Sequence, residues 1–297
     1  MTDYTFASAN GHLVLVQRGA TAPPACARGL QLDTPPSVGH NRGVSKTAVA
    51  KPVSMQTTVD SLYGGKLQLK QSRSGYRYSV DAVLLAAFAQ GGVDRTLDLG
   101  TGVGVVGLQL CYEGKSERVV GLEVQPALAR LAEANVVLND CEERCEITVG
   151  DLRDTKTVRA LGSFDRVIMN PPYFAAKAGR LPPNEEKAIA KHKLLGGLDE
   201  WMRAAHVALL PGGILELIYP CDRLVDLIVY ARAHELNPIE LTIVHSRPKS
   251  HAVLALVRCQ KESAAGLNVT APWVIFSSGG KPSSRFSALR GGIPDTK

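Results

Sequence analysis

The chain of 297 residues has few aromatic residues, few cysteines and no long apolar run. No stretch approaches the ~18 uncharged apolar residues that a membrane-spanning helix requires. The first 24 residues also lack the basic start and apolar segment of a secretory signal. Hydrophobic residues still make up 45% and charged residues 21%, which excludes a wholly disordered or fibrous chain. These features predict a cytoplasmic protein without a membrane partner.

The six cysteines are scattered, and only Cys141 and Cys145 lie close together in the sequence. A zinc site would need a second such pair or a histidine cluster to complete its ligand set. The sequence offers neither, and cytoplasmic thiols stay reduced. We therefore expect buried free thiols and no metal site.

The net charge of +6 comes from the two ends of the chain, because residues 57–278 carry equal numbers of acidic and basic side chains. The first 56 residues hold five prolines and a net charge of +3, and residues 279–297 hold another +3. This composition predicts a flexible basic head at 1–56, one folded domain at 57–278 and a partly docked tail at 279–297. A basic protein often binds nucleic acid, but the neutral domain makes charge alone weak support for RNA.

Apolar strands alternate with helical segments between residues 57 and 278. The expected helices cover 79–90, 105–114, 126–139, 198–210 and 224–235, and the expected strands cover 96–99, 118–124, 146–149, 164–169, 214–219, 239–245 and 252–259. Ser79 and Asp81 are candidate caps of the first helix. Alternation predicts parallel strands with helices on both faces, and the short loop 246–251 makes the last two strands antiparallel. The predicted fold is therefore α/β, a doubly wound, seven-stranded, mostly parallel sheet with a terminal antiparallel hairpin.

A glycine-rich loop follows the first expected strand and reads Asp98-Leu99-Gly100-Thr101-Gly102-Val103-Gly104. Glycines allow a ligand to approach the backbone, and the NH groups of the following helix point toward that ligand. Gly102 to Gly107 also matches the dinucleotide fingerprint. The charge of Asp98 would repel a pyrophosphate, whereas it would attract the ammonium and sulfonium of S-adenosylmethionine. We assign Asp98, Gly100, Thr101, Gly102 and Gly104 to binding of that cofactor.

Two further carboxylates follow the next two strands. Glu123 ends an otherwise apolar strand, where a carboxylate can accept hydrogen bonds from both ribose hydroxyls of a nucleotide. Asp151 follows the third strand and can contact the adenine amino group of the cofactor. A helix N-cap is the competing interpretation of Asp151.

The motif Asn170-Pro171-Pro172-Tyr173 follows the fourth strand, at the sheet edge where open α/β sheets bind ligands. The two prolines form a rigid turn without NH donors. The Asn170 side-chain oxygen and the Pro171 carbonyl can then accept both hydrogens of one planar NH2 group, and Tyr173 can stack on a conjugated ring. Because these contacts favour the pyramidal amine that attacks a methyl group, the motif predicts N-methylation without a strong base.

These motifs resemble those of the class I S-adenosylmethionine-dependent methyltransferases of the Asn-Pro-Pro-Tyr group, which modify adenine N6 in nucleic acids and glutamine amides in proteins. Segment 75–85, GYRYSVDAVLL, is similar to that of the bacterial tRNA1(Val) (adenine-N6)-methyltransferases. The resemblance implies a Rossmann-like fold and methylation of the adenine just 3′ of a tRNA anticodon. It assigns the cofactor to Asp98, Gly100, Gly102, Glu123 and Asp151, and the amine to Asn170, Pro171 and Tyr173.

Basic residues flank these motifs and favour RNA among the possible substrates. One group lies in 66–77 (Lys66, Lys70, Arg73, Arg77) and the other in 177–193 (Lys177, Arg180, Lys187, Lys191, Lys193). Both groups would lie beside the site, where phosphate contacts position an RNA. The alternatives are a protein glutamine-N5 methyltransferase, whose amide fits the same two acceptors, and an inactive scaffold that binds cofactor or RNA.

Overall fold

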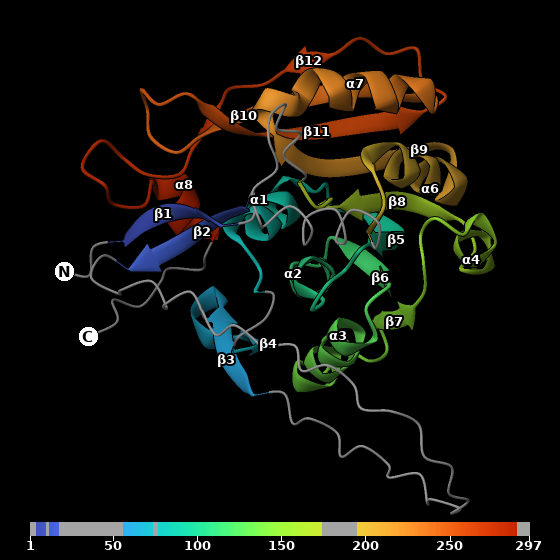
Figure 1. The fold of residues 1–297 in the computed structure, drawn as a ribbon, viewed down its shortest axis with the longest axis horizontal. Helices are drawn as coiled ribbons and strands as arrows, with labels where there is room; N and C mark the ends of the chain where they lie inside the picture. Colours follow the sequence, from blue (N-terminus) through green and yellow to red (C-terminus); the bar gives the residue numbers. More distant parts are fainter. Residues whose placement is uncertain (1–3, 10–11, 18–55, 74–76, 174–194, 290–297) are drawn as a thin grey trace, which may run out of the picture.

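The computed structural model describes residues 4–9, 12–17, 56–73, 77–173 and 195–289. The strands of its central sheet are β5 (Val93–Leu99), β6 (Ser116–Glu123), β7 (Cys145–Val149), β8 (Phe164–Met169), β9 (Leu209–Pro220), β10 (Leu236–His245), β11 (Ala252–Lys261), β12 (Asn268–Val269) and β13 (Trp273–Val274). The order across the sheet is β12-β10-β11-β9-β8-β5-β6-β7 (Figure 1). Strand β13 also pairs with β10.

The pairing of these strands confirms the predicted fold class. Strands β7, β6, β5, β8 and β9 run parallel, while β11 is antiparallel to both β9 and β10. The seven predicted strands are β5 to β11, and the two-residue strands β12 and β13 extend the sheet beyond them. Strand β9 begins at Leu209, so Pro211-Gly212-Gly213, expected to separate a helix from a strand, lies inside the strand.

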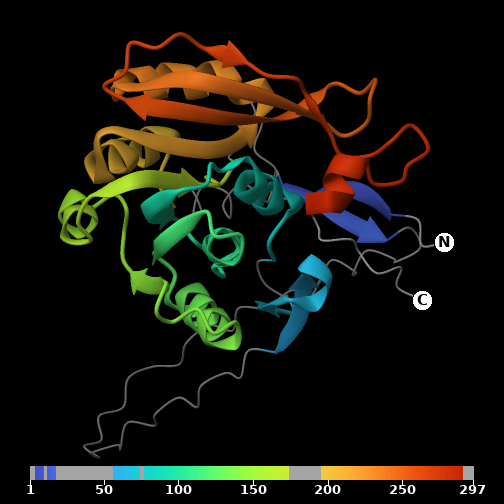
Figure 2. The same ribbon diagram turned by 180° about the vertical axis from the view of Figure 1, so that it is seen from behind.

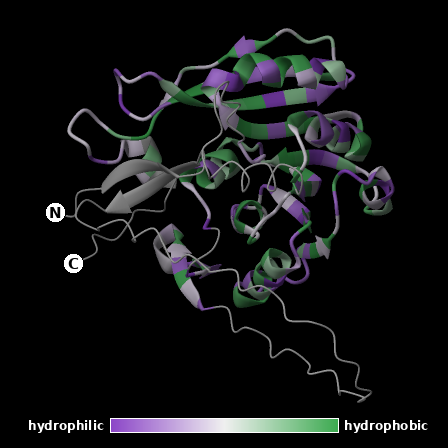
Figure 3. Ribbon diagram, viewed as in Figure 1, coloured by the Kyte–Doolittle hydropathy of each residue, from purple (hydrophilic) through white to green (hydrophobic). Residues whose placement is uncertain are grey.

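Helices cover the two faces of the sheet, as the views from both sides show (Figures 1 and 2). Two buried clusters form, and the apolar residues gather along the strands and the helix faces that pack on them (Figure 3). One cluster involves α1 (Val80–Phe88), α2 (Val105–Tyr112), α3 (Pro126–Leu138) and α8 (Ser284–Leu289). The other involves α4 (Thr155–Ala160), α6 (Leu198–Ala208) and α7 (Leu224–Ala233). None of the helices in the described part of the chain has the length and apolar character that crossing a membrane requires.

Two antiparallel hairpins outside the sheet were not anticipated from the sequence. Strands β1 (Tyr4–Ala9) and β2 (His12–Gln17) pair inside the segment predicted to be a flexible head, and residues 18–55 lie outside the described residues. Strands β3 (Thr57–Leu62) and β4 (Leu67–Ser72) form the second hairpin. The division of the chain into head, domain and tail stays a prediction.

Side-chain amides of α3 attach the β3–β4 hairpin to the domain. The Asn135 side chain accepts a hydrogen bond from Lys70 N at 2.6 Å and donates to Lys70 O at 3.0 Å. Its amide also donates to Val103 O in the glycine loop, at 2.9 Å. One turn later, Asn139 makes the same two bonds to the backbone of Gln68. The hairpin is therefore joined to the glycine loop through one buried asparagine.

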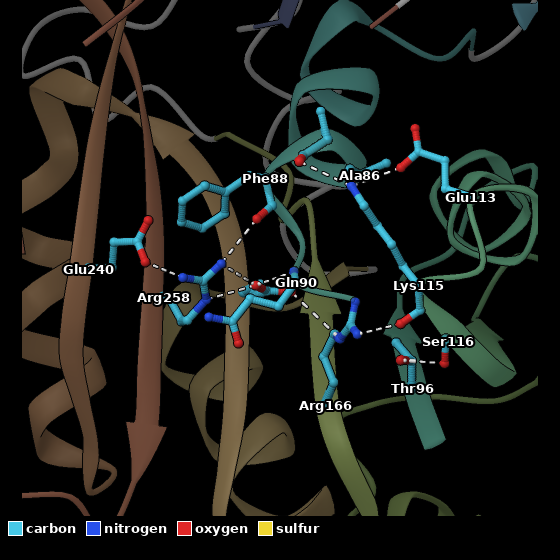
Figure 4. Close-up of polar contacts among 12 residues, drawn as sticks. Ala86, Phe88, Gln90, Thr96, Glu113, Lys115, Ser116, Arg166, Glu240 and Arg258 are labelled. Atoms are coloured by element: carbon cyan, nitrogen blue, oxygen red, sulfur yellow. Dashed lines mark hydrogen bonds and ion pairs between the residues drawn. The ribbon is translucent and has the colours of Figure 1, made fainter. Parts of the chain in front are cut away.

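Cations hold the C-terminal end of α1. Its last carbonyls accept from the Lys115 ammonium, at 2.8 Å for Ala86 and 3.1 Å for Ala87, and from the Arg258 guanidinium, at 3.0 Å for Phe88 (Figure 4). Positive groups are favourable there because these carbonyls carry the negative end of the helix dipole. At the other end, Ser79 occupies the N-cap position, but its side chain makes no capping bond. The prediction of a side-chain cap at Ser79 was therefore wrong.

The same arginine belongs to a buried charge network beneath α1. Glu216 accepts from the Arg258 guanidinium at 2.8 Å and from Gln90 N at 3.1 Å, and Arg166 lies 3.6 Å from its second oxygen. Arg258 also pairs with Glu240. Burial raises the pKa of Glu216 and lowers that of Arg166, because both charged forms lose their hydration.

Glu216→Ala should lower the free energy of unfolding by about 3–5 kcal/mol, because it leaves two buried guanidinium groups without their carboxylate. Urea unfolding would measure this loss. Asp226→Ala is the matched control, since it removes the carboxylate of the exposed Arg223–Asp226 pair and should cost ~1 kcal/mol or less. Equal effects of the two substitutions would contradict the importance of the buried network.

Candidate active site

The carboxyl ends of four parallel strands bring the predicted site residues to one edge of the sheet. The register pairs Leu99 of β5 with Leu122 of β6 and with Met169 of β8, and it pairs Glu123 with Val149 of β7. The turns that follow these strands therefore start side by side. They are the glycine loop, the turn after Glu123, the turn that contains Asp151 and the Asn-Pro-Pro-Tyr turn.

An open pocket lies at this edge, and its empty volume of about 660 Å³ includes space that is open to solvent. Six of the predicted residues line it: Gly100, Gly102, Glu123, Asp151, Asn170 and Pro172. Leu128, Leu152, Leu195 and Trp201 supply apolar walls. The pocket therefore combines backbone, two carboxylates and an amide with apolar surface.

Glu123 is a buried carboxylate that organises two of the turns. Its Oε2 accepts from Gly102 N at 3.0 Å, and its Oε1 accepts from Gln125 N at 2.9 Å. Burial raises its pKa, and these backbone NH groups oppose the rise. The side chain is only 4% exposed, so it is not a solvated charge at a strand end.

Asp98 stabilises the glycine loop through hydrogen bonds and does not line the pocket. Its Oδ2 accepts from Thr101 Oγ1 at 2.7 Å and from Gly107 N at 3.3 Å. Among the described residues, Asp98, Thr101 and Gly104 shape the loop but do not line the pocket. These residues thus hold the shape of the loop whose Gly100 and Gly102 line the pocket. Direct contact of the three residues with the cofactor stays a prediction.

Asp151 faces the pocket and is bound by a residue that the sequence analysis did not single out. The Arg153 guanidinium donates to Asp151 Oδ1 at 2.9 Å and to Oδ2 at 2.6 Å. This pairing holds the pKa of Asp151 below its ordinary value. The N-cap interpretation of Asp151 does not hold, because Asp154 caps α4 by accepting from Lys156 N at 3.0 Å.

The Asn-Pro-Pro-Tyr turn closes the pocket on the β8 side. Asn170 Oδ1 accepts from the Tyr173 hydroxyl at 2.9 Å, and the same hydroxyl lies 3.4 Å from Asp81 Oδ2. The Tyr173 ring packs edge-on against Tyr219, with centroids 5.4 Å apart. Pro171 is buried while Pro172 reaches the pocket. Stacking of Tyr173 on a substrate ring stays a prediction.

Trp201 is one of the pocket residues that were not predicted from the sequence. It comes from α6, on the face of the sheet opposite α1, and its indole NH donates to Leu195 O at 2.8 Å. A Cβ placed on Gly100 would lie 2.3 Å from the Trp201 ring. The only sequence signal was one large aromatic residue in an amphipathic helix.

Gly100→Ala should unfold more easily than the wild type and lose most of its ligand affinity. The reason is twofold: Gly100 has a φ of +69°, and the added methyl group would displace Trp201. Gly92→Ala is the matched control, because Gly92 has a φ of +72° but open space around it. Thermal melting of both variants separates backbone strain from the clash, and equal losses would contradict the contact with Trp201.

Asp98→Asn should stabilise the ligand-free protein above about pH 6. Burial raises the pKa of Asp98 from 3.8 to about 6, so the folded state retains a proton that the unfolded state has released. Wild-type stability therefore falls as the pH rises through this window, by ~3 kcal/mol in total. Asparagine keeps an acceptor for Thr101 and Gly107 without the buried charge. Urea unfolding should show the variant more stable at about pH 8 and equal near pH 4, and no difference at pH 8 would contradict the raised pKa.

Comparisons with known proteins agree with this geometry. The model of the methyltransferase small domain family matches residues 79–191. A tRNA1(Val) (adenine(37)-N6)-methyltransferase from Porphyromonas gingivalis is 33% identical over 190 residues, which cover 62% of this chain and 74% of that protein. A protein of the same name from Aeromonas salmonicida is 27% identical over 235 residues, covering 75% of this chain and 92% of that protein. The crystal structure of a predicted O-methyltransferase from Agrobacterium tumefaciens matches with a TM-score of 0.57 and 26% identity, over 73% of this chain and 100% of that one.

The residues of the pocket fit S-adenosylmethionine. Bare backbone at Gly100 and Gly102 lets a ligand approach closely, and the buried carboxylate of Glu123 suits the hydroxyls of a ribose. The apolar walls suit a purine, and the nearby carboxylates suit the positive charge of the methionine part. With the matches to known proteins, this shows that the chain belongs to the class I S-adenosylmethionine-dependent methyltransferases.

Proposed function

We propose that this protein methylates the exocyclic N6 of an adenine in RNA, next to the anticodon of a tRNA, in the cytoplasm. The relatives from Porphyromonas gingivalis and Aeromonas salmonicida carry the name of that reaction. The observation that carries the proposal is the position of Asn170, whose amide lies at the wall of the cofactor pocket. An amine held there would face the methyl donor.

Asn170 and Pro171 act on the amine. The lone pair of an adenine amino group is delocalised into its ring, which makes the group a poor nucleophile. Acceptance of its two hydrogens by Asn170 Oδ1 and the Pro171 carbonyl favours the pyramidal form, and the rigid turn holds both acceptors in place. S-adenosylmethionine supplies the electrophilic methyl group when it is bound.

The remaining pocket residues hold the cofactor. Glu123 accepts hydrogen bonds from its ribose hydroxyls, and Asp151 contacts its adenine amino group. Arg153 fixes the Asp151 carboxylate for that contact. Gly100 and Gly102 place bare backbone against the ligand.

The β3–β4 hairpin offers phosphate contacts for the tRNA. Lys66 and Arg73 are exposed on it, and Lys70 is partly exposed. Arg77 forms an ion pair with Asp60 and is thereby directed toward the hairpin itself. Basic side chains that contact phosphates position an RNA without reading its sequence. The second basic group, at 177–193, lies outside the described residues.

A methyl-transfer assay tests the proposed reaction. The purified protein and labelled S-adenosylmethionine are incubated with total tRNA, and separately with protein extract, both from cells that lack this gene. Label in tRNA that digests to N6-methyladenosine supports the proposal. Label found only in protein would instead indicate glutamine methylation, and cofactor binding without any transfer would indicate a scaffold.

Asn170→Ala should abolish methyl transfer while the affinity for S-adenosylmethionine changes little. The substitution removes the acceptor that acts on the amine, whereas Glu123, Asp151 and the glycine loop are untouched. Calorimetry with the cofactor and single-turnover transfer to tRNA separate the two effects. Full activity of the variant would exclude this role of Asn170.

A further inference from the structure

We infer that Asp81 is a positioning residue for methyl transfer: it takes over the hydrogen bond of the Tyr173 hydroxyl and thereby frees Asn170 Oδ1 for the substrate amine. This inference rests on the proposed function, because it assumes that Asn170 accepts from an amino group. It adds a residue from the first turn of α1, distant in sequence from the Asn-Pro-Pro-Tyr motif.

Among the described residues, the Tyr173 hydroxyl proton faces two acceptors. Tyr173 Oη lies 2.9 Å from Asn170 Oδ1 and 3.4 Å from Asp81 Oδ2. The first distance is that of a good hydrogen bond, and the second is longer than usual for O–H···O. The hydroxyl therefore donates to Asn170 when no substrate is present.

The hydrogen bond from Tyr173 competes with the proposed function of Asn170, which is to accept a hydrogen bond from the substrate amine. A proton donated to Oδ1 withdraws electron density from the oxygen and occupies one of its two lone-pair directions. An amine bound at the same oxygen would then meet a weaker acceptor. A second acceptor for the Tyr173 proton removes this competition, and a carboxyl group suits this role because its two oxygens offer several lone pairs.

Asp81 is well placed to be that acceptor. It lies in the first turn of α1, where the helix dipole favours a negative charge, and its side chain is fully buried, with 0% exposure. The position of the helix is fixed at its other end by Lys115 and Arg258 (Figure 4). The carboxylate thus remains beside the Tyr173 hydroxyl, and only rotation of that hydroxyl is needed to exchange acceptors.

A double-mutant cycle tests this role. Asp81→Ala leaves the Tyr173 proton on Asn170, so kcat should fall about tenfold with little change in the KM for tRNA, which corresponds to one hydrogen bond. Tyr173→Phe keeps the ring but removes the competing proton, so Asn170 Oδ1 stays available to the amine whether or not Asp81 is present. The decisive prediction is suppression: the double variant should be more active than Asp81→Ala alone.

A purely structural role of Asp81 predicts a different pattern. The double variant would then be as impaired as Asp81→Ala, or more so, and this result would overturn the inference, as would full activity of Asp81→Ala. Ser79→Ala is the matched control, because Ser79 is buried at the same helix end and its hydroxyl has no hydrogen-bond partner among the described residues. Should Asp81→Ala fail to fold, Asp81→Asn keeps the volume and should show a smaller loss that Tyr173→Phe also suppresses.

A spectroscopic measurement keeps the inference separate from the proposed reaction. The full chain is labelled with carbon-13 at tyrosine Cζ, and the Tyr173 signal is assigned by its loss in Tyr173→Phe. Addition of an adenosine-containing tRNA anticodon stem-loop to wild type should shift this signal, and the shift should be lost in Asp81→Asn. An identical response in both proteins would overturn the inference. Absence of transfer by the wild type would instead count against the proposed function.

Discussion

Glu216 lies beneath α1 with two arginines around it, and this buried charge network fixes the C-terminal end of that helix. Its carboxylate binds Arg258 and the backbone NH of Gln90, just beyond the end of α1. Arg258 in turn donates to the Phe88 carbonyl within the last turn of that helix. A helix fixed in this way at its C-terminal end holds its first turn beside the Asn-Pro-Pro-Tyr motif, where Asp81 lies 3.4 Å from the Tyr173 hydroxyl.

Three carboxylates lie where the pocket forms, two of them buried and one half-buried, and each has a defined partner. Asp98 binds the glycine loop, Glu123 binds the loop and the turn after β6, and Asp151 binds Arg153. Dehydration of a carboxylate is costly, so backbone NH groups and a guanidinium compensate for it. These bonds hold the loops in place before a ligand arrives, and this preorganisation lowers the conformational cost of binding.

Local patterns in the sequence were sufficient to predict the sheet and its main turns. Apolar strands with glycine or proline at their ends predicted β5 to β11, and parallel pairing brought Gly100, Glu123, Asp151 and Asn170 to one edge. Contacts between distant segments were not predictable in this way. Trp201 reaches the pocket from the opposite face of the sheet, and the β3–β4 hairpin is held by amides of α3. The sequence predicted a helix cap at Asp81, whereas the structure shows its side chain beside the Tyr173 hydroxyl.

The proposed reaction predicts that the modification disappears from cells that lack this gene. Total tRNA of the native organism is isolated from wild-type cells, from cells without this gene, and from the latter complemented with either the wild-type or the Asn170→Ala gene. Mass spectrometry of nuclease fragments then locates N6-methyladenosine. We expect this nucleoside just 3′ of the anticodon in wild-type cells and in cells complemented with the wild-type gene, and we expect it to be absent from the deletion strain and from cells complemented with the Asn170→Ala gene. The same level of N6-methyladenosine in all four strains would contradict the account.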